Sequence, residues 1–215
     1  MNEELSINSE ESDAIDNFHK FSELGTEFFY KKEYDSAIRN MERALGALEM
    51  YIPTNIKFIL ENLSHRLLFL GLRNKLRLQL GTTYRKSGYL YKAKQIFEDL
   101  IHFTKEFGSQ KFLGFEEMIL GYYPISRHEL LSRLWNEMGL IFSELKLYNQ
   151  ALNAFYKSTH KPSIKVSFSY HNPWLEIAEL HEHLGEYSIA KSAKKKYKKT
   201  EKLIRKVDRK RGCRW

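Results

Sequence analysis

The stretch FSELGTEFFYKKEYDSAIRNMERAL (residues 21–45) decides the fold of this chain. Its apolar residues recur at steps of three and four on either side of a polar break at residues 31–33, and they are Phe21, Leu24, Phe28, Ala37, Met41 and Ala44. Such steps place one apolar stripe along a helix. Gly25 leaves room for a second helix to approach closely, and Met41 is placed to fill that room. The stretch therefore predicts a helix–turn–helix hairpin.

The same spacing returns three more times along the chain. The second copy has Arg77, Leu80, Gly81, Tyr84, Leu90, Ala93, Phe97 and Leu100. The third copy has Trp135, Met138, Gly139, Phe142, Tyr148, Ala151, Phe155 and Ser158. The fourth and weaker copy has Trp174, Ile177, Ala178, His181, Tyr187, Ala190 and Tyr197. A single accidental amphipathic helix does not give four matching sets of intervals, so we expect a repeated hairpin.

At these residues the chain resembles the tetratricopeptide repeat family, over roughly residues 18–51, 74–107, 132–165 and 171–200. The fourth copy departs from the family pattern, because His181 and Lys194 stand where the family usually has aromatic residues. The resemblance implies an all-α fold in which helical hairpins stack into a right-handed superhelical solenoid. It does not imply one particular activity, because the family serves many partners with the same scaffold.

The register of the repeats is irregular. Equivalent residues are separated by 56, 58 and 39 positions, against about 34 in the standard unit. Two apolar inserts fill the wider intervals, residues 54–72 and 112–125, and each is either an extra helix or an extension of its neighbour. We expect Ser126 or Arg127 to open the third hairpin. Asn172 followed by Pro173 is typical of a helix N-terminus.

The two ends of the chain carry opposite charge. The first 16 residues hold six acidic side chains and no Lys or Arg, whereas residues 191–215 hold thirteen Lys or Arg against Glu201 and Asp208. No stop signal follows Tyr187 until about Asp208, so we expect a long basic C-terminal helix. The organisation we expect is a disordered acidic segment (1–16), a repeat domain (17–190) and a basic helical extension (191–215).

Composition is that of a soluble globular protein, 42% hydrophobic and 29% charged, and the few breakers (11 Gly and 4 Pro) favour helix. A single cysteine excludes an intrachain disulfide and indicates an intracellular, reducing compartment. The longest aliphatic stretch, residues 67–72, is too short to span a membrane. We therefore expect a cytoplasmic protein, with a cytoskeletal, ciliary or nuclear location as the alternatives.

No arrangement of residues indicates catalysis, so we expect neither an enzyme nor a protein with a cofactor. His181 and His183 are two positions apart, and side chains two apart on a helix diverge by about 200°. We expect a packed His181 and a solvated His183 rather than a metal site. The chain has no Gly-rich phosphate loop and no nucleophile elbow.

The resemblance implies a concave groove lined by the first helix of each hairpin. Carried over by position, the candidate groove residues are Ser22, Thr26, Phe29, Tyr30, Leu78, Thr82, Arg85, Lys86, Asn136 and Leu140. The family's clamp for a chaperone's C-terminal carboxylate needs Lys and Asn where this chain has Ser22 and Thr26. We therefore do not expect this chain to bind chaperones in that way.

The second candidate surface is a basic patch on the C-terminal helix. Its lysines follow helical steps of three and four and are Lys191, Lys194, Lys195, Lys198 and Lys202. Such a stripe suits an acidic protein surface, nucleic acid or an anionic membrane, or it serves only as a soluble cap. Sequence-specific RNA binding is not favoured, because few aromatic side chains accompany the charge.

Two function hypotheses follow for a scaffold protein. In the first, the groove captures a peptide or helix of another protein. In the second, the basic helix docks the chain on an anionic polymer, such as acidic cytoskeletal tails or nucleic acid. Salt separates the two, because contacts made by many charges weaken steeply as ionic strength rises.

Overall fold

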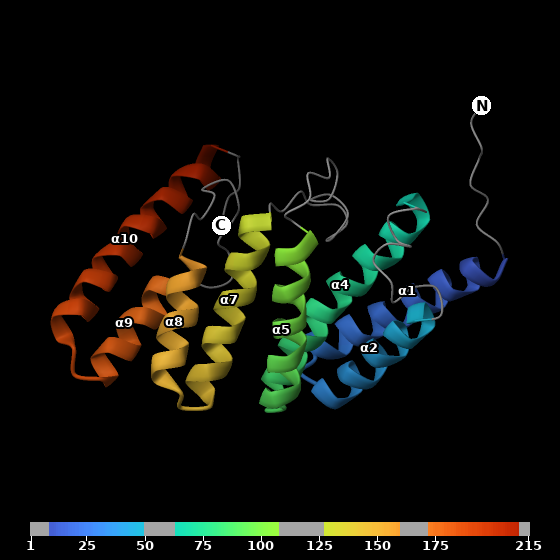
Figure 1. The fold of residues 1–215 in the computed structure, drawn as a ribbon, viewed down its shortest axis with the longest axis horizontal. Coiled ribbons are helices and arrows are strands. Elements are labelled where there is room, and N and C mark those ends of the chain that lie inside the picture. Colours follow the sequence, from blue (N-terminus) through green and yellow to red (C-terminus); the bar gives the residue numbers. More distant parts are fainter. Residues whose placement is uncertain (1–8, 50–62, 108–126, 160–171, 211–215) are drawn as a thin grey trace. The chain divides into compact units, whose positions relative to one another are not determined.

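The computed structural model is helical and describes residues 9–49, 63–107, 127–159 and 172–210 (Figure 1). No strand occurs in these ranges, which confirms the all-α prediction for this part of the chain. The helices are α1 (Ser9–Tyr30), α2 (Tyr34–Glu49), α4 (Leu63–Lys86), α5 (Leu90–Phe107), α7 (Arg127–Glu144), α8 (Tyr148–Ser158), α9 (Pro173–His183) and α10 (Tyr187–Lys210).

Four turns of three residues join these helices in pairs, and all four share one backbone geometry. The middle residue of each turn has a positive φ of 61–83°, and these residues are Lys32, Gly88, Lys146 and Gly185. The next residue donates its N–H to a carbonyl five positions earlier at 2.8–2.9 Å, a Schellman closure. The accepting carbonyls belong to Phe28, Tyr84, Phe142 and His181, the equivalent residues of the four predicted copies. The turns therefore confirm the predicted register.

Small residues let the paired helices interlock, as the pattern predicts. A Cβ added to Gly25 would lie 2.7 Å from Met41 Cγ, and one added to Gly139 would lie 2.5 Å from Phe155 Cε1. Real Cβ contacts are not this short, so each glycine is required by the side chain that covers it. Met41 and Phe155 are both almost fully buried. The contacts of α1 with α2, of α7 with α8 and of α9 with α10 confirm that these pairs are hairpins.

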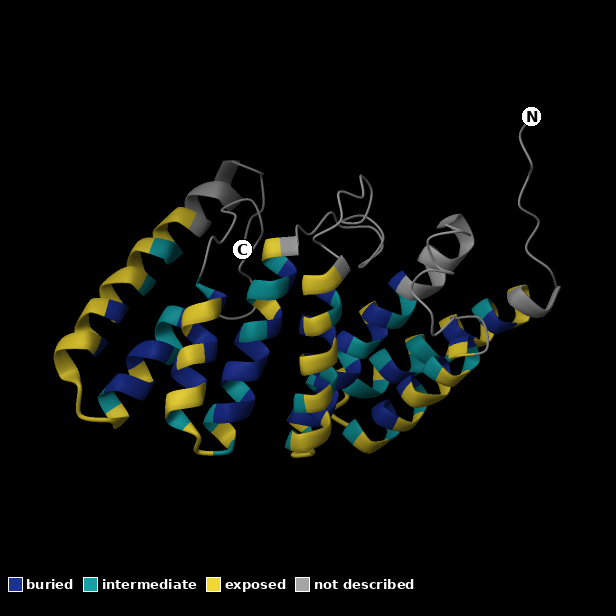
Figure 2. Cartoon of the chain, in the orientation of Figure 1, coloured by how far each residue is buried: buried dark blue, intermediate teal, exposed yellow. Residues whose placement is uncertain are grey.

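The chain forms two compact units. The first unit comprises residues 1–96 with 111–124, and the second comprises residues 97–110 with 125–215. In the first unit α2 packs against both α1 and α4. In the second unit α8 packs against α7 and α9, and α9 packs against α10. Figure 2 shows buried residues on the helix faces that meet and exposed residues on the outward faces, with α10 exposed over most of its described length.

A cation over an aromatic ring recurs in three hairpins at one pair of positions. The two residues lie eleven positions before and after the positive-φ residue of the turn. Arg43 lies 5.9 Å from the Phe21 ring centre, Lys157 lies 4.3 Å from that of Trp135, and Lys196 lies 4.2 Å from that of Trp174. Lys105 approaches the Trp135 ring as well, at 5.2 Å. These contacts cover large aromatic residues that the hairpin core leaves half-exposed.

The structure settles several expected helix ends. Helix α1 begins at Ser9, so residues 9–16, which we expected to be disordered, are helical, and Ala14 is buried. Helix α4 runs without a break from Leu63, so this part of the first insert is an extension of the second hairpin. Residues 54–62 and 112–125 lie outside the described ranges. Helices α7 and α10 begin and extend as predicted.

Asn172 caps α9 as the sequence predicts. Its side-chain oxygen accepts a hydrogen bond from the Trp174 N–H at 3.2 Å, and Pro173 occupies the first turn. None of the helices in the described ranges combines the length and the apolar character needed to cross a membrane.

Candidate docking surface

Helix α10 packs on α9 through small residues and presents lysines elsewhere. Ala190 and Ala193 are buried, and Tyr197 is half-buried. These positions follow steps of three and four and so form one face of the helix. The other residues of this segment include seven lysines from Lys191 to Lys202, all of them exposed. The packing face is therefore narrow, and the rest of this segment is basic.

Four of these lysines form a straight, unpaired row. Lys191, Lys195, Lys198 and Lys202, here called the lysine row, are separated by steps of four, three and four and span about 16 Å along the helix. No carboxylate of the described residues forms an ion pair with any of them. Four like charges side by side repel one another, so the row attracts anionic groups from solution.

Of the three lysines outside the row, Lys194 and Lys196 are engaged and Lys199 is exposed. The Lys194 ammonium group lies 2.5 Å from Glu182 Oε1, and both side chains are partly exposed. Lys196 lies over the Trp174 ring on the far side of the helix. All five lysines of the predicted basic patch are thus exposed, but the Lys194 charge is offset by Glu182. Four remain available to a partner.

Sequence reasoning did not single out the aromatic residue at the start of this row. Tyr187 lies four positions before Lys191, which places it on the same face of α10, and 71% of it is exposed. Exposed tyrosines are frequent anchors in protein–protein interfaces. The spacing of four positions between Tyr187 and Lys191 is the feature of the sequence that could have identified this tyrosine as part of the same surface.

The predicted groove residues differ widely in their access to solvent. Tyr30 and Lys86 are exposed, and those half-buried are Ser22, Thr26, Phe29, Thr82 and Leu140. The Thr26 and Thr82 hydroxyls donate to carbonyls of their own helices, those of Ser22 and Leu78, at 2.8 and 3.1 Å. Leu78, Arg85 and Asn136 are buried, with 4–8% exposed, and offer a partner little surface. They pack inside their units, so we do not retain them as contact residues.

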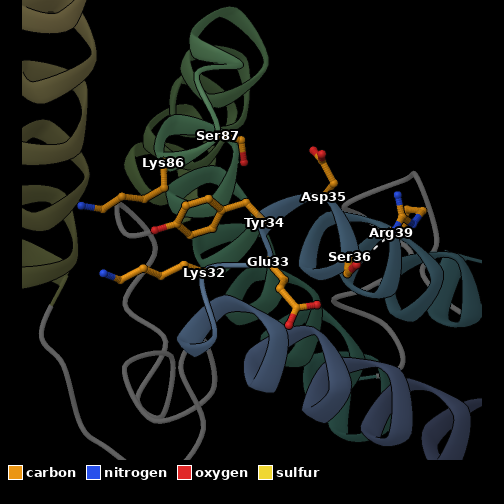
Figure 3. A pocket seen from close by; sticks show the side chains of 8 residues that line it. All are labelled: Lys32, Glu33, Tyr34, Asp35, Ser36, Arg39, Lys86 and Ser87. Carbon is orange, nitrogen blue, oxygen red and sulfur yellow. Dashed lines mark hydrogen bonds between the residues drawn. The ribbon is translucent and has the colours of Figure 1, made fainter.

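A wide, open hollow of about 600 Å³ lies in the first unit beside the turn between α1 and α2 (Figure 3). It is lined by Lys32, Glu33, Tyr34, Asp35, Ser36, Arg39, Lys86 and Ser87. The Lys32 and Lys86 ammonium groups lie on the same side as the Tyr34 hydroxyl (Figure 3). Arg39 donates to the Ser36 hydroxyl at 3.1 Å. Three donors at one edge can hold a carboxylate, although Glu33 and Asp35 reduce the net positive charge.

A Tyr–His–Glu chain joins three segments of the second unit. The Tyr156 hydroxyl lies 2.9 Å from His181 Nε2, and His181 Nδ1 lies 2.5 Å from Glu186 Oε2. One neutral tautomer fits, in which Nδ1–H donates to the carboxylate and Nε2 accepts from the hydroxyl. Burial, and to a lesser extent the Glu186 charge, raises the pKa of Tyr156. The hydroxyl is therefore a poor nucleophile, and the chain of hydrogen bonds acts as a joint between helices.

The histidines are placed as predicted. His181 is buried with both ring nitrogens engaged, and His183 is exposed with its ring 4.6 Å from that of Tyr148. Among the described residues, no three His, Cys, Asp or Glu side chains gather closely enough to hold a metal ion.

Comparison with known proteins gives no match to a family model and none to a curated protein.

Proposed function

We propose that this chain is a non-catalytic adaptor of the tetratricopeptide kind, which docks on an acidic polypeptide through the lysine row of α10. The observation that carries the proposal is the unpaired row itself, four exposed ammonium groups on one helix face. Unbalanced like charge on a folded surface destabilises the compact state unless a partner neutralises it. Of the two surfaces predicted from the sequence, this one keeps its proposed contact residues accessible.

The chemistry of α10 favours a polypeptide over nucleic acid or a membrane. The seven basic side chains from Tyr187 to Leu203 are all lysines, which contact anions as compact point charges, and Arg205 and Arg209 follow them on α10. Tyr197 is half-buried, so no aromatic platform alternates with the row for bases to stack on. The small apolar face of α10 is occupied by α9, so it does not enter a bilayer.

The test is the affinity of the full chain for fluorescent poly-glutamate, measured by anisotropy at several salt concentrations. We expect the substitutions Lys195→Glu and Lys198→Glu together to weaken binding by more than about tenfold. Each new carboxylate lies four positions from a remaining lysine on α10. Such pairs stabilise a helix, so α10 remains helical. The matched control, Lys75→Glu with Lys146→Glu, removes the same charge from exposed sites elsewhere and should change binding by less than about threefold.

Two results would contradict the proposal. One is equal loss of poly-glutamate binding in the control and in the row variant, because the effect then comes from net charge. The other is tighter binding to a duplex DNA of the same charge at the same salt concentration, because the partner is then a nucleic acid.

A second candidate function is capture of a partner's peptide by the first unit. The hollow beside the turn between α1 and α2 favours it, because Lys86, a predicted groove residue, and Lys32 direct their ammonium groups to one edge of that hollow (Figure 3). Replacing Lys32 and Lys86 by Glu should abolish binding of an acidic peptide to this unit, while the row variant retains it.

A further inference from the structure

Glu182, on α9, forms an ion pair with Lys194, a lysine that lies beside the lysine row. We infer that Glu182 is an internal competitor of the acidic partner, and that it lowers the affinity of this surface by neutralising Lys194. This inference rests on the proposed function, because it concerns the regulation of the same surface. It goes beyond that function, because it gives an acidic residue of this chain an effect opposite to that of the lysines.

Lys194 adjoins the lysine row by its position on α10. It lies three positions after Lys191 and four positions before Lys198, and side chains at these spacings are neighbours on a helix surface. The Lys194 side chain is 46% exposed, so burial does not keep it from a partner. If its charge were not offset by Glu182, a partner would therefore meet five neighbouring lysines in place of four.

The ion pair lies within one hairpin of the second unit. The Lys194 ammonium group lies 2.5 Å from Glu182 Oε1, and α9 and α10 pack against each other. The Glu182 side chain is 40% exposed, so water screens the attraction between the two charges. A carboxylate of a partner can therefore replace Glu182, but the binding free energy is then reduced by the free energy of breaking the ion pair.

Two other carboxylates near this hairpin are placed differently from that of Glu182. Glu186 Oε2 lies 2.5 Å from Nδ1 of the buried His181, so the histidine already holds that carboxylate. Glu179 lies three positions before Glu182 on α9, is exposed, and forms no ion pair with the described part of the chain. Of the three carboxylates, the structure pairs that of Glu182 with a lysine of α10. Glu179 is therefore a matched control, with the same charge on the same helix.

The affinity of the full chain for fluorescent poly-glutamate, measured by anisotropy in about 50 mM salt, tests this inference. Glu182→Gln keeps the size of the side chain and removes its charge, so Lys194 becomes available to poly-glutamate. We expect this variant to bind about three- to fivefold more tightly than wild type, the gain from one further exposed ion pair. Glu179→Gln changes the net charge by the same amount and should alter the affinity by less than about 1.5-fold.

A double variant tests whether Lys194 is the source of the gain. Glu182→Gln with Lys194→Gln removes both members of the ion pair and leaves the lysine row and the net charge unchanged. Its affinity for poly-glutamate should return to within about 1.5-fold of wild type. Circular dichroism should show the wild-type helix content for every variant, because none of the substituted side chains is buried.

The outcomes separate this inference from the proposed function. Equal tightening by Glu179→Gln and Glu182→Gln overturns the inference, because the gain then comes from net charge. It is also overturned if Glu182→Gln does not tighten binding, or if the double variant binds as tightly as Glu182→Gln alone. In these cases the proposed function stands, provided that Lys195→Glu with Lys198→Glu weakens binding. A wild-type chain that does not bind poly-glutamate refutes both.

Discussion

The hairpin of α7 with α8 and the hairpin of α9 with α10 share one backbone plan and differ at one decisive pair of residues. In the first hairpin Phe155 covers Gly139 and is fully buried. In the hairpin of α9 with α10 the equivalent residues are Ala178 and Lys194, and the lysine side chain points outward and pairs with Glu182. Both hairpins keep the same turn and the same cation over tryptophan. The residue at this one position, Phe155 or Lys194, thus decides whether the second helix of a hairpin contributes a buried apolar side chain or an exposed charge.

The largest expected effect comes from removing the apolar knob. Phe155→Ala should lower the free energy of unfolding by about 3–5 kcal/mol, because it removes a fully buried ring and leaves a cavity beside Gly139. Lys194→Ala, at the equivalent position, should cost less than about 0.5 kcal/mol, because it removes only a surface ion pair. Urea unfolding followed by circular dichroism measures both. Similar losses in the two variants would show that the hairpins are held in the same way.

A smaller effect is expected from filling the space under that ring. The Cβ of Gly139→Ala would lie 2.5–2.9 Å from three atoms of the Phe155 ring. Overpacking of this kind costs about 1–3 kcal/mol, and better helix propensity returns about 1 kcal/mol of it. We expect a net loss of up to about 2 kcal/mol in the free energy of unfolding.

The control for Gly139 is a glycine with open space around it. A Cβ added to Gly46, on α2, meets no atom within 4 Å. Gly46→Ala should therefore stabilise the chain by roughly 0.5–1 kcal/mol through helix propensity alone. Opposite signs for the two variants in the same unfolding experiment would support the interlock. A gain in both would mean that Phe155 moves aside without cost.

The hairpins could be predicted because their signals are local. Gly139 and Phe155 are sixteen positions apart, and the order of small and large residues reports that contact without knowledge of the rest of the fold. The cap at Asn172 is likewise a property of two adjacent residues. The cation over Trp135 and Trp174 was missed, although its constant spacing of 22 positions is present in the sequence.

The candidate groove and the helical acidic segment could not be predicted in the same way. Burial of Leu78 and Asn136 depends on which face of each helix meets a neighbour from elsewhere in the chain, and a stripe pattern does not state this. The acidic composition of residues 9–16 suggested disorder, yet acidic residues stabilise a helix N-terminus. Ala14 and Phe18 add the packing that makes this helix form.

Helices α9 and α8 begin in different ways. Asn172 accepts the Trp174 N–H, whereas Leu147 stands at the N-cap of α8 and makes no side-chain cap. Asn172→Ala should lower the free energy of unfolding by about 1 kcal/mol, because a helix N–H loses its acceptor. Leu147→Ala, on a residue that is 42% exposed, should cost clearly less. If both variants lose the same amount, the Asn172 side chain contributes no cap.

An effect of similar size concerns the hydrogen bond that joins the hairpin of α7 with α8 to the hairpin of α9 with α10. The Tyr156 hydroxyl on α8 contacts His181 on α9, and burial followed by the Glu186 charge raises the pKa of Tyr156 in the folded state. Above about pH 10 the unfolded chain ionises this tyrosine while the folded chain keeps its proton. The folded state then binds more protons, so the free energy of unfolding falls as pH rises.

Tyr156→Phe should therefore cost about 0.5–1.5 kcal/mol at neutral pH, through the lost hydrogen bond. Between about pH 9 and 11 the variant should lose stability less steeply than wild type, because it has no proton to release at this position. Urea midpoints across that range measure the difference in slope. Tyr148→Phe, on the same helix, controls for the loss of a hydroxyl. Parallel slopes for wild type and Tyr156→Phe would show that the joint between the hairpins does not depend on that proton.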